Sequence, residues 1–476
     1  MKKLVPVVVG IGAVLILTLT VFIISALITN GAMRTATAQL IAEKEAEGHI
    51  TGELLVWLDN NEWAHAVIAA FEKHYPNVHV KYENIGNVDS RGKVSLDGPA
   101  GIGPDVFMMP HDHIINAVID GICLPFPPED KEKYSGLVLE ASIRTCIFYD
   151  DFYKEDMLFA IPISTENIAF FYNRDLLGNS PVPQTFEEII SFAERNNSST
   201  DFRFALRWQV DDSYHNYFFL TAFGMQLFGP DMNDFTQPGF DSEGAKQGIE
   251  FHNSLRNIYN VNTADATWDS TVAAFQRGEV PFTITGPWAI GDALRNGINF
   301  GVTRLPTIAG NQPRCFSGNI VAAVSSYSRN IPAARAFIDF LVSEEGMTIQ
   351  FEQTGKLASL KDISRIEGLR DNPHLMGIME QAPFADPMPV IPEVNQMWDA
   401  LKALFTFTWD RQLSVEEAQE KAMETYDIAL QMAGKSRFET TNEEHSTSSF
   451  RYLIPIVILL ALLVFILISV KKRSRK

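Results

Sequence analysis

The sequence lacks the motifs with which most enzymes hold a nucleotide, a metal or a catalytic nucleophile. It contains no glycine-rich phosphate loop, no metal-ligand spacing, no nucleophile motif and no internal repeat. Cysteine is also scarce, because a chain of 476 residues has only Cys123, Cys146 and Cys315. Cys123 and Cys146 could pair in an external domain; three buried thiols are an equal alternative, and we predict no disulfide. These absences argue against an enzyme and predict neither a cofactor nor a bound metal.

Basic residues are scarce in the long middle of the chain. All 58 acidic residues lie between residues 31 and 450, but eight of the 39 Lys and Arg residues lie outside that segment. Thus 31 basic residues remain there, for a net charge of −27. Nucleic-acid binding requires clustered cations, so we predict no nucleic-acid partner. An acidic surface suits a domain that stands off an anionic membrane.

Charge is absent from two apolar runs near the ends of the chain. Residues 4–28 follow two lysines, and residues 452–470 precede the sequence Lys-Lys-Arg-Ser-Arg-Lys. Each run is long enough to cross a bilayer as a helix. Because basic flanks favour the cytoplasmic side, we expect both termini to be cytoplasmic and residues 31–450 to lie on the extracytoplasmic side of the cell membrane.

These runs predict how the chain is divided. A cleavable signal peptide has an apolar stretch of only about 7–15 residues, so we interpret the first run as an uncleaved anchor, with cleavage near Ala32 as the alternative. The expected order is an N-terminal transmembrane signal anchor (1–30), a helical stalk (31–50), the main domain (51–435), a linker (436–451), a C-terminal transmembrane helix (452–470) and a basic cytoplasmic tail (471–476).

The main domain opens with the pattern of a parallel α/β sheet. Apolar runs at 53–58, 78–82 and 106–109 predict strands, and residues 62–75 have apolar side chains at helical spacing. Strand–helix–strand order is typical of a parallel sheet. Further along we expect helices at 184–195, 242–258, 331–341, 394–408 and 414–433, strands at 204–210, 281–285, 300–305 and 319–324, and irregular structure at 356–378.

Polar residues follow directly after the predicted strands. Asp59 begins a polar segment after the first strand, and Asp112 and His113 follow the third. Ligands of α/β sheets bind beyond the carboxyl ends of the strands, so we expect these side chains to converge. The run of His111, Asp112 and His113 does not predict a metal site, because alternating residues of a strand point to opposite faces.

Residues 157–179 form the segment around which the domain is organised. Two apolar runs, 157–163 and 168–172, are separated by a polar break that contains Glu166. Since no hairpin turn joins them, we expect the chain to leave one sheet here and enter another. A carboxylate between two buried runs must reach water or be satisfied by hydrogen bonds. We therefore expect Glu166 to lie in a cleft.

The same segment resembles a known family. Pro162-Ile163-Ser164, then Ala169-Phe170-Phe171-Tyr172-Asn173, then Leu177-Gly178-Asn179 satisfy the signature of extracellular solute-binding proteins of sugar transporters, the maltose-binding-like family. The resemblance covers roughly residues 53–430. It implies an α/β, two-lobed, periplasmic-binding-protein-like fold of type II, with lobe I at about 51–164 and 320–368 and lobe II at about 168–316 and 374–435.

The resemblance also implies a function without catalysis: capture of a carbohydrate ligand by cleft closure and its delivery to an ABC import permease. Carried over by position, it implies these ligand-binding residues: Asp59, Asn61, Glu62, Met109, Asp112, His113, Glu166, Asp212, Tyr214, Trp268, Trp288, Met388, Trp398 and Lys402.

The residue types in this set suit a sugar. Indole and phenol rings, such as those of Trp288 and Tyr214, can lie against the apolar C–H face of a pyranose. Carboxylates, such as those of Asp59 and Glu166, accept hydrogen bonds from pairs of hydroxyls. The set therefore predicts a polyhydroxylated ligand.

Departures from the family pattern argue against maltose itself. Family members that bind maltodextrins have Lys at Glu62, Arg at His113 and Lys402, and Trp at Met109. We therefore expect a sugar or short oligosaccharide, and the sequence leaves its identity open. Two further functions are open at this stage: a tethered carbohydrate sensor or adhesin with the same fold, and a glycosidase that uses a carboxylate pair such as Asp112 with Glu166.

Overall fold

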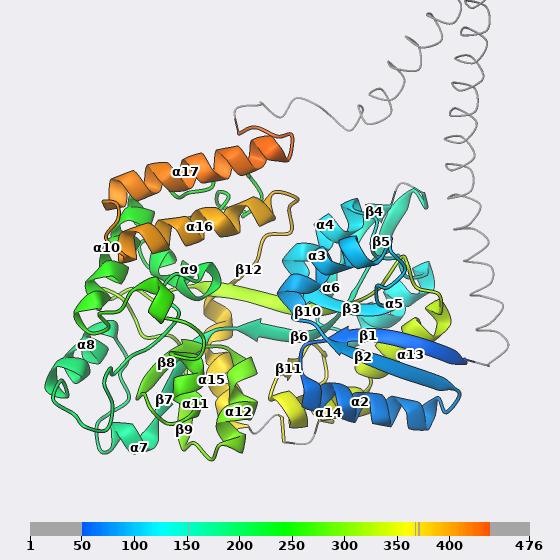
Figure 1. The fold of residues 1–476 in the computed structure, drawn as a ribbon, viewed down its shortest axis with the longest axis horizontal. Coiled ribbons are helices and arrows are strands. Elements are labelled where there is room, and N and C mark those ends of the chain that lie inside the picture. Colours follow the sequence, from blue (N-terminus) through cyan, green and yellow to red (C-terminus); the bar gives the residue numbers. More distant parts are fainter. Residues whose placement is uncertain (1–49, 151, 367, 370–371, 438–476) are drawn as a thin grey trace, which may run out of the picture.

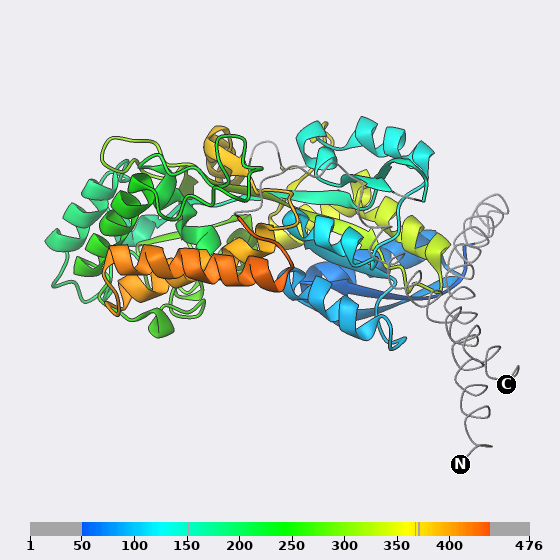
Figure 2. The ribbon, with the colours of Figure 1, turned by 90° about the horizontal axis from the view of Figure 1, so that it is seen from above.

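The computed structural model describes residues 50–437, apart from residues 151, 367 and 370–371. The predicted N-terminal anchor, the C-terminal transmembrane helix and the basic tail lie outside the described residues, as do nearly all of the stalk and the linker. None of the helices in the described part is both long enough and apolar enough to cross a membrane. The described chain forms two α/β lobes that lie side by side and are joined by strands running between them (Figures 1 and 2).

Lobe I is built on a mixed sheet of strand order β11-β6-β10-β3-β1-β2. The first three strands in sequence are parallel, as predicted, with β1 between β2 and β3. The elements of this lobe are β1 (Gly52–Leu58), α2 (Asn61–His74), β2 (Val78–Asn84), α3 (Asn87–Asp97), β3 (Val106–Pro110), η1 (His111–His113), α4 (Ile114–Ile119), α5 (Pro128–Leu137), α6 (Glu140–Arg144), β4 (Ile147–Asp150), β5 (Glu155–Leu158), β6 (Ile161–Asn167), β10 (Cys315–Val324), α13 (Ile331–Leu341), α14 (Glu344–Thr354) and β11 (Leu357–Ala358).

Lobe II is built on a small antiparallel sheet of order β8-β7-β9, surrounded by helices. Its elements are β7 (Ala169–Asn173), α7 (Arg174–Leu177), α8 (Phe186–Arg195), α9 (Ser213–Thr221), α10 (Glu243–Ser254), η2 (Leu255–Asn257), η3 (Thr263–Asp265), α11 (Val272–Gln276), β8 (Phe282–Thr285), η4 (Pro287–Ala289), α12 (Ile290–Arg295), β9 (Phe300–Thr303), α15 (Pro373–Gln381), η5 (Ala382–Phe384), β12 (Ala385–Pro387), α16 (Val394–Trp409) and α17 (Val415–Met432).

Helix α2 shows how local chemistry positions the first strand end. The Asn60 side chain caps the helix by accepting a hydrogen bond from the Trp63 N–H at 2.8 Å. Trp63, Val67 and Phe71 then bury one face of the helix. Because the cap fixes where the helix starts, Asp59 is held in the turn between β1 and α2.

The expected passage from one sheet to another is confirmed. β6 pairs with β10 and β11 in lobe I, whereas β7 pairs with β8 and β9 in lobe II, and Ile168 alone separates β6 from β7. β10 makes a second passage: its first residues pair with β12, and its later residues pair with β3. These two extended segments run from one lobe to the other near the middle of the molecule (Figure 1).

Three segments differ from the sequence-based expectation. The strand expected at 204–210 is a loop with one bridge, from Leu206 to Phe282, and most of its apolar residues are buried without regular pairing. The run 157–163 is divided between β5 and β6. The segment 356–378 contains β11 and most of α15, whose start is marked by the Asn372 cap and by Pro373 in the first turn.

The three cysteines are buried free thiols, so the alternative of unpaired cysteines is confirmed. Burial raises the pKa of Cys146 and of Cys315 to about 12. The thiolate is the reactive form, so these side chains behave as small apolar groups in the core.

His252 gives lobe II a dependence on pH. Its ring is fully buried in α10, with centroids 4.7 Å from Trp409, 5.0 Å from Phe219 and 5.1 Å from Phe405. Burial lowers its pKa from 6.5 to about 3. The His252 ring therefore takes up a proton more readily in the unfolded chain than in the folded chain. As a result, the free energy of unfolding decreases as pH falls from about 6.5 toward 3.

We expect His252→Phe to remove this dependence. The stability of the wild-type fragment 31–450, relative to the variant, falls by up to about 1.4 kcal/mol per pH unit below pH 6.5. Urea unfolding of both proteins at pH 7.5, 6.0 and 5.0 measures the difference. Because all other titrating groups are shared, parallel curves of stability against pH for the two proteins would contradict the assignment.

Candidate functional site

A cavity of about 540 Å³ lies between the lobes, where the strands β1, β3 and β6 of lobe I end. Most of the site residues predicted from the sequence line it. From lobe I these are Asp59, Asp112, His113 and Glu166; from lobe II they are Asp212, Tyr214, Trp288, Met388, Trp398 and Lys402. Lobe I thus supplies mainly carboxylates, and lobe II supplies the aromatic rings. Their part in binding a ligand stays a prediction.

Four residues of the predicted set are not part of the cavity wall. Asn61 and Glu62 are exposed in the first turn of α2, and the Asn61 side chain instead accepts hydrogen bonds from β2. Met109 is fully buried in the core, because alternation along β3 turns it away from the cavity. Trp268 is exposed on a loop of lobe II. Position in the sequence gave the right strand ends but not the direction of each side chain.

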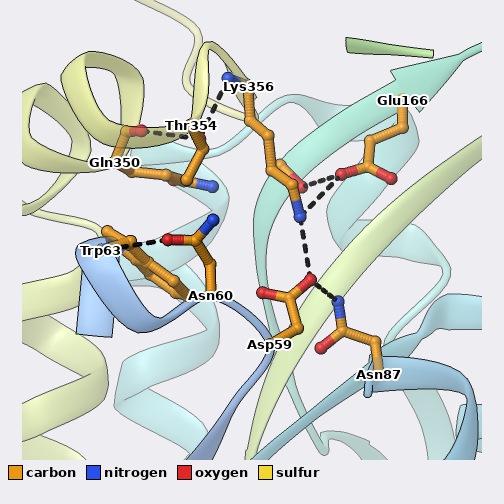
Figure 3. A network of polar contacts seen from close by, with 9 residues as sticks. Asp59, Asn60, Trp63, Asn87, Glu166, Gln350, Thr354 and Lys356 are labelled. Atoms are coloured by element: carbon orange, nitrogen blue, oxygen red, sulfur yellow. Dashed lines mark hydrogen bonds and ion pairs between the residues drawn. The ribbon is translucent and has the colours of Figure 1, made fainter. Parts of the chain in front are cut away.

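Lys356 lines the same cavity, and sequence reasoning missed it. Its ammonium lies 3.2 Å from Asp59 Oδ2 and 3.4 Å from Glu166 Oε1, and only 7% of the residue is exposed (Figure 3). Asn87 donates to Asp59 Oδ2 at 2.7 Å, and Ser164 donates to Glu166 Oε1 at 3.1 Å. Lys356 is therefore the buried cation of the cavity wall, whereas Lys402 is an exposed one.

The position of Lys356 follows from the end of α14. Gly355 stops the helix with a φ of +70°, a left-handed conformation that glycine adopts without strain. The next residues form β11, in which Leu357 pairs with Thr165 and Ala358 with Ser164. Antiparallel register then places Lys356 opposite Glu166. A helix-ending glycine followed by one lysine and an apolar pair was the available signal.

The two neighbouring carboxylates determine the charge state of Lys356. Burial by itself lowers the pKa of the Lys356 ammonium, but the carboxylates of Asp59 and Glu166 outweigh burial and hold the pKa above its ordinary value. Lys356 is therefore charged at neutral pH. An ion pair this deeply buried is costly to break from one side, because the remaining charge has no compensation.

The aromatic side of the cavity has its own packing. The rings of Tyr214 and Trp288 lie 6.2 Å apart, and Phe316 supports both Tyr214 and Trp398 from behind, with centroid distances of 6.0 and 5.6 Å. Tyr214, Trp288 and Trp398 are all partly exposed. Partly exposed rings with fixed orientations can receive the flat apolar face of a ligand.

Asp212 stands at the start of α9 and caps it. Its Oδ1 accepts hydrogen bonds from the His215 backbone N–H at 2.9 Å and from the His215 ring at 2.7 Å. Burial raises the pKa of Asp212, but the interactions with His215 outweigh this and lower it overall. Asp212 is therefore an ionised acceptor on the lobe II side of the cavity.

One hydrogen bond crosses the cavity between the lobes. Trp398 Nε1, on α16, donates to Asp112 Oδ2, on η1, at 3.2 Å. Beside it, the Asn116 amide donates to the Pro392 carbonyl at 3.2 Å. On another flank, Arg295 of α12 donates to the Gln353 carbonyl of α14 at 3.1 Å. The lobes thus meet on both sides of the cavity.

The His111-Asp112-His113 segment lies in the short helix η1, not on a strand as we had assumed, so the argument from strand alternation was wrong. The geometry still gives His111 a structural role. Its Nδ1 accepts from the Asn319 N–H at 3.0 Å, so Nε2 carries the proton and donates to the Met388 carbonyl at 3.2 Å. Within the described ranges, no group of three His, Cys, Asp or Glu side chains could hold a metal ion.

Comparison with known proteins agrees with this architecture. The galactooligosaccharide-binding protein of Bacillus subtilis (strain 168) is 27% identical over 390 residues, which cover 78% of this chain and 88% of that protein. The maltotriose-binding protein of Pyrococcus abyssi (strain GE5 / Orsay) is 25% identical over 366 residues, covering 74% of this chain and 76% of that protein.

A solved structure is similar over most of the described part. The crystal structure of a cyclo/maltodextrin-binding protein complexed with maltotetraose superposes with a TM-score of 0.64 and 26% identity, covering 80% of this chain and 97% of that chain. The family model of the bacterial extracellular solute-binding proteins matches residues 58–348. Since this match extends over more than half of the sequence, the chain belongs to the bacterial extracellular solute-binding protein family.

Proposed function

We propose that this protein is a membrane-tethered receptor that captures a sugar or short oligosaccharide between its lobes and delivers it to an ABC import permease. The observation that carries the proposal is the cavity between the lobes, with carboxylates on one wall and oriented aromatic rings on the other. Carboxylates accept hydrogen bonds from hydroxyls, and rings cover the apolar face of a pyranose. The sugar-binding names of the relatives support the same class of ligand.

The tether is proposed from the sequence alone. Two apolar runs with basic flanks would hold residues 31–450 on the extracytoplasmic side, with both termini in the cytoplasm. A tether keeps the receptor near a permease in the same membrane and so raises its effective concentration there. Ligand-driven closure of the lobes would then present the loaded form to the permease.

A glycosidase is not favoured by the geometry. Of the two carboxylates considered for it, Glu166 lies against the Lys356 ammonium and Asp112 accepts from the Trp398 indole. Both are engaged with protein groups that fix their position. The relatives reported above are binding proteins by name.

The carbohydrate part of the proposal is tested by titration. We expect fragment 31–450 to bind at least one member of a panel of galacto- and maltooligosaccharides, two to five sugars long, in isothermal calorimetry. Binding should change the tryptophan fluorescence, because Trp288 and Trp398 line the cavity. If no member binds at millimolar concentration, the ligand class is wrong.

The aromatic wall is tested by one substitution with a matched control. Trp288→Ala should weaken binding of the best panel sugar by about 10-fold or more, because the stacking ring is lost. Trp268→Ala removes the same side chain from an exposed loop outside the cavity wall and should leave the affinity unchanged. If the two variants bind the sugar with equal affinity, Trp288 is not part of the binding site.

Lys356 is tested through stability. Lys356→Met should lower the free energy of unfolding by about 3 kcal/mol, because it leaves Asp59 and Glu166 without their shared cation. Lys402→Met removes an exposed lysine from the same cavity and should change stability by less than about 0.5 kcal/mol. Urea unfolding measures both, and a Lys356 variant as stable as the Lys402 variant would refute the buried ion-pair group.

A further inference from the structure

His215 lies behind the aromatic wall of the cavity, in the first turn of α9. The three residues before it, Asp212, Ser213 and Tyr214, line the cavity, whereas His215 is only 7% exposed and is not among the described residues of the wall. A ligand in the cavity therefore meets the neighbours of His215 and not its ring. An imidazole is costly to bury unless its polar atoms are satisfied or its ring is needed there.

The two ring nitrogens of His215 have different environments. Nδ1 lies 2.7 Å from Asp212 Oδ1, and because a carboxylate accepts, Nδ1 is the donor. Nε2 is buried and has no hydrogen-bond partner among the described residues. One hydrogen bond thus ties the ring to a carboxylate whose side chain is 37% exposed and lines the cavity. The other end of the ring is held by packing.

This packing is against two rings of the aromatic wall. The imidazole stands nearly perpendicular to the Trp288 indole, at an interplanar angle of 88° and with centroids 6.0 Å apart. It meets the Tyr214 ring at 75° and 5.8 Å. Perpendicular ring contacts are directional, because the positive edge of one ring meets the negative face of the other. The His215 ring therefore helps to set the orientation of Trp288.

Gly286 restricts the same indole. A Cβ at this position would lie 2.3 Å from two carbons of the six-membered ring of Trp288, so the indole lies directly on the glycine. The φ of Gly286 is −111°, which any residue can adopt, so glycine is needed here for space and not for backbone conformation. With Gly286 and His215 both against it, the indole has little freedom to turn.

We propose that His215 is a positioning residue: it fixes the Trp288 indole relative to the Asp212 carboxylate and so determines which sugars fit both groups. A sugar engages the ring with its apolar face and the carboxylate with a hydroxyl. Sugars differ in how a hydroxyl is directed relative to that face, so two protein groups at a fixed angle favour one arrangement over another. The selectivity rests on the proposed carbohydrate function and deepens it, whereas the positioning of Trp288 does not depend on a ligand.

Fluorine NMR tests the positioning without a ligand. The detergent-solubilised full-length chain is labelled with fluorotryptophan, and the Trp288 resonance is identified by its loss in Trp288→Phe. His215→Asn keeps a donor for Asp212 but has no ring, so we expect the Trp288 resonance to shift or broaden. His215→Phe keeps a ring against the indole but has no donor, and its Trp288 resonance should stay close to that of the wild type.

Two further variants serve as controls, and thermal unfolding verifies that each variant is folded. Gly286→Ala displaces the indole and should shift its resonance. His374→Asn removes a histidine ring that stacks on Phe300 at 4.0 Å, outside the cavity wall, and should leave the Trp288 resonance unchanged. A wild-type resonance in His215→Asn beside a shifted one in Gly286→Ala would overturn the proposal. So would a displaced resonance in His215→Phe, and this variant decides by itself if His215→Asn does not fold.

Titration tests the selectivity. The wild type and the folded variants are titrated with β-1,4-galactotriose and maltotriose. We expect the ratio of the two affinities to change about 10-fold in His215→Asn and to stay as in the wild type in His374→Asn. Equal weakening of both sugars, with the ratio unchanged, would refute the selectivity. If neither sugar binds to the wild type, the carbohydrate function fails, and the resonances still decide whether His215 positions Trp288.

Discussion

The buried ammonium of Lys356, held between the carboxylates of Asp59 and Glu166, is the interaction on which the rest of the cleft depends. It joins three parts of lobe I: the turn after β1, the crossing strand β6, and the short strand that follows α14. Coulombic attraction in a poorly solvated site is strong, so these parts cannot separate without exposing charge. Asp59 and Glu166 are thereby fixed at the floor of the cavity.

Around that fixed group the two lobes line the cavity with different kinds of side chain. Lobe I supplies acceptors rooted in a mixed sheet, and lobe II supplies rings backed by Phe316. The chain passes from one sheet to the other at β6–β7 and along β10. The two walls of the cavity are therefore connected through short backbone segments. Such connections suit a hinge, because small rotations at the base move the walls by larger distances. The hydrogen bond from Trp398 to Asp112 is the point where the walls already touch across the cavity.

Comparison with the relatives places the features of this cavity in the context of a shared fold. The chain has the fold of a cyclo/maltodextrin-binding protein solved with maltotetraose and is 27% identical to a galactooligosaccharide-binding protein. In its own cavity the buried cation is Lys356, and Met109 lies in the core. A shared fold does not by itself fix the ligand, because binding depends on the side chains at the site.

The sequence by itself determined the elements that depend on local patterns. Apolar runs and helical spacing gave β1, α2 and the passage from β6 to β7, and the rule that ligands bind beyond strand ends gave Asp59, Asp112 and Glu166. Only the tertiary structure decided which polar groups meet. Lys356 reaches Asp59 across 297 positions, and Trp398 reaches Asp112 across 286. Local patterns report burial and spacing along one segment, whereas such contacts are set by sheet register and by how the lobes pack. For the same reason the sequence could not tell that Met109 and Glu62 point away from the cavity.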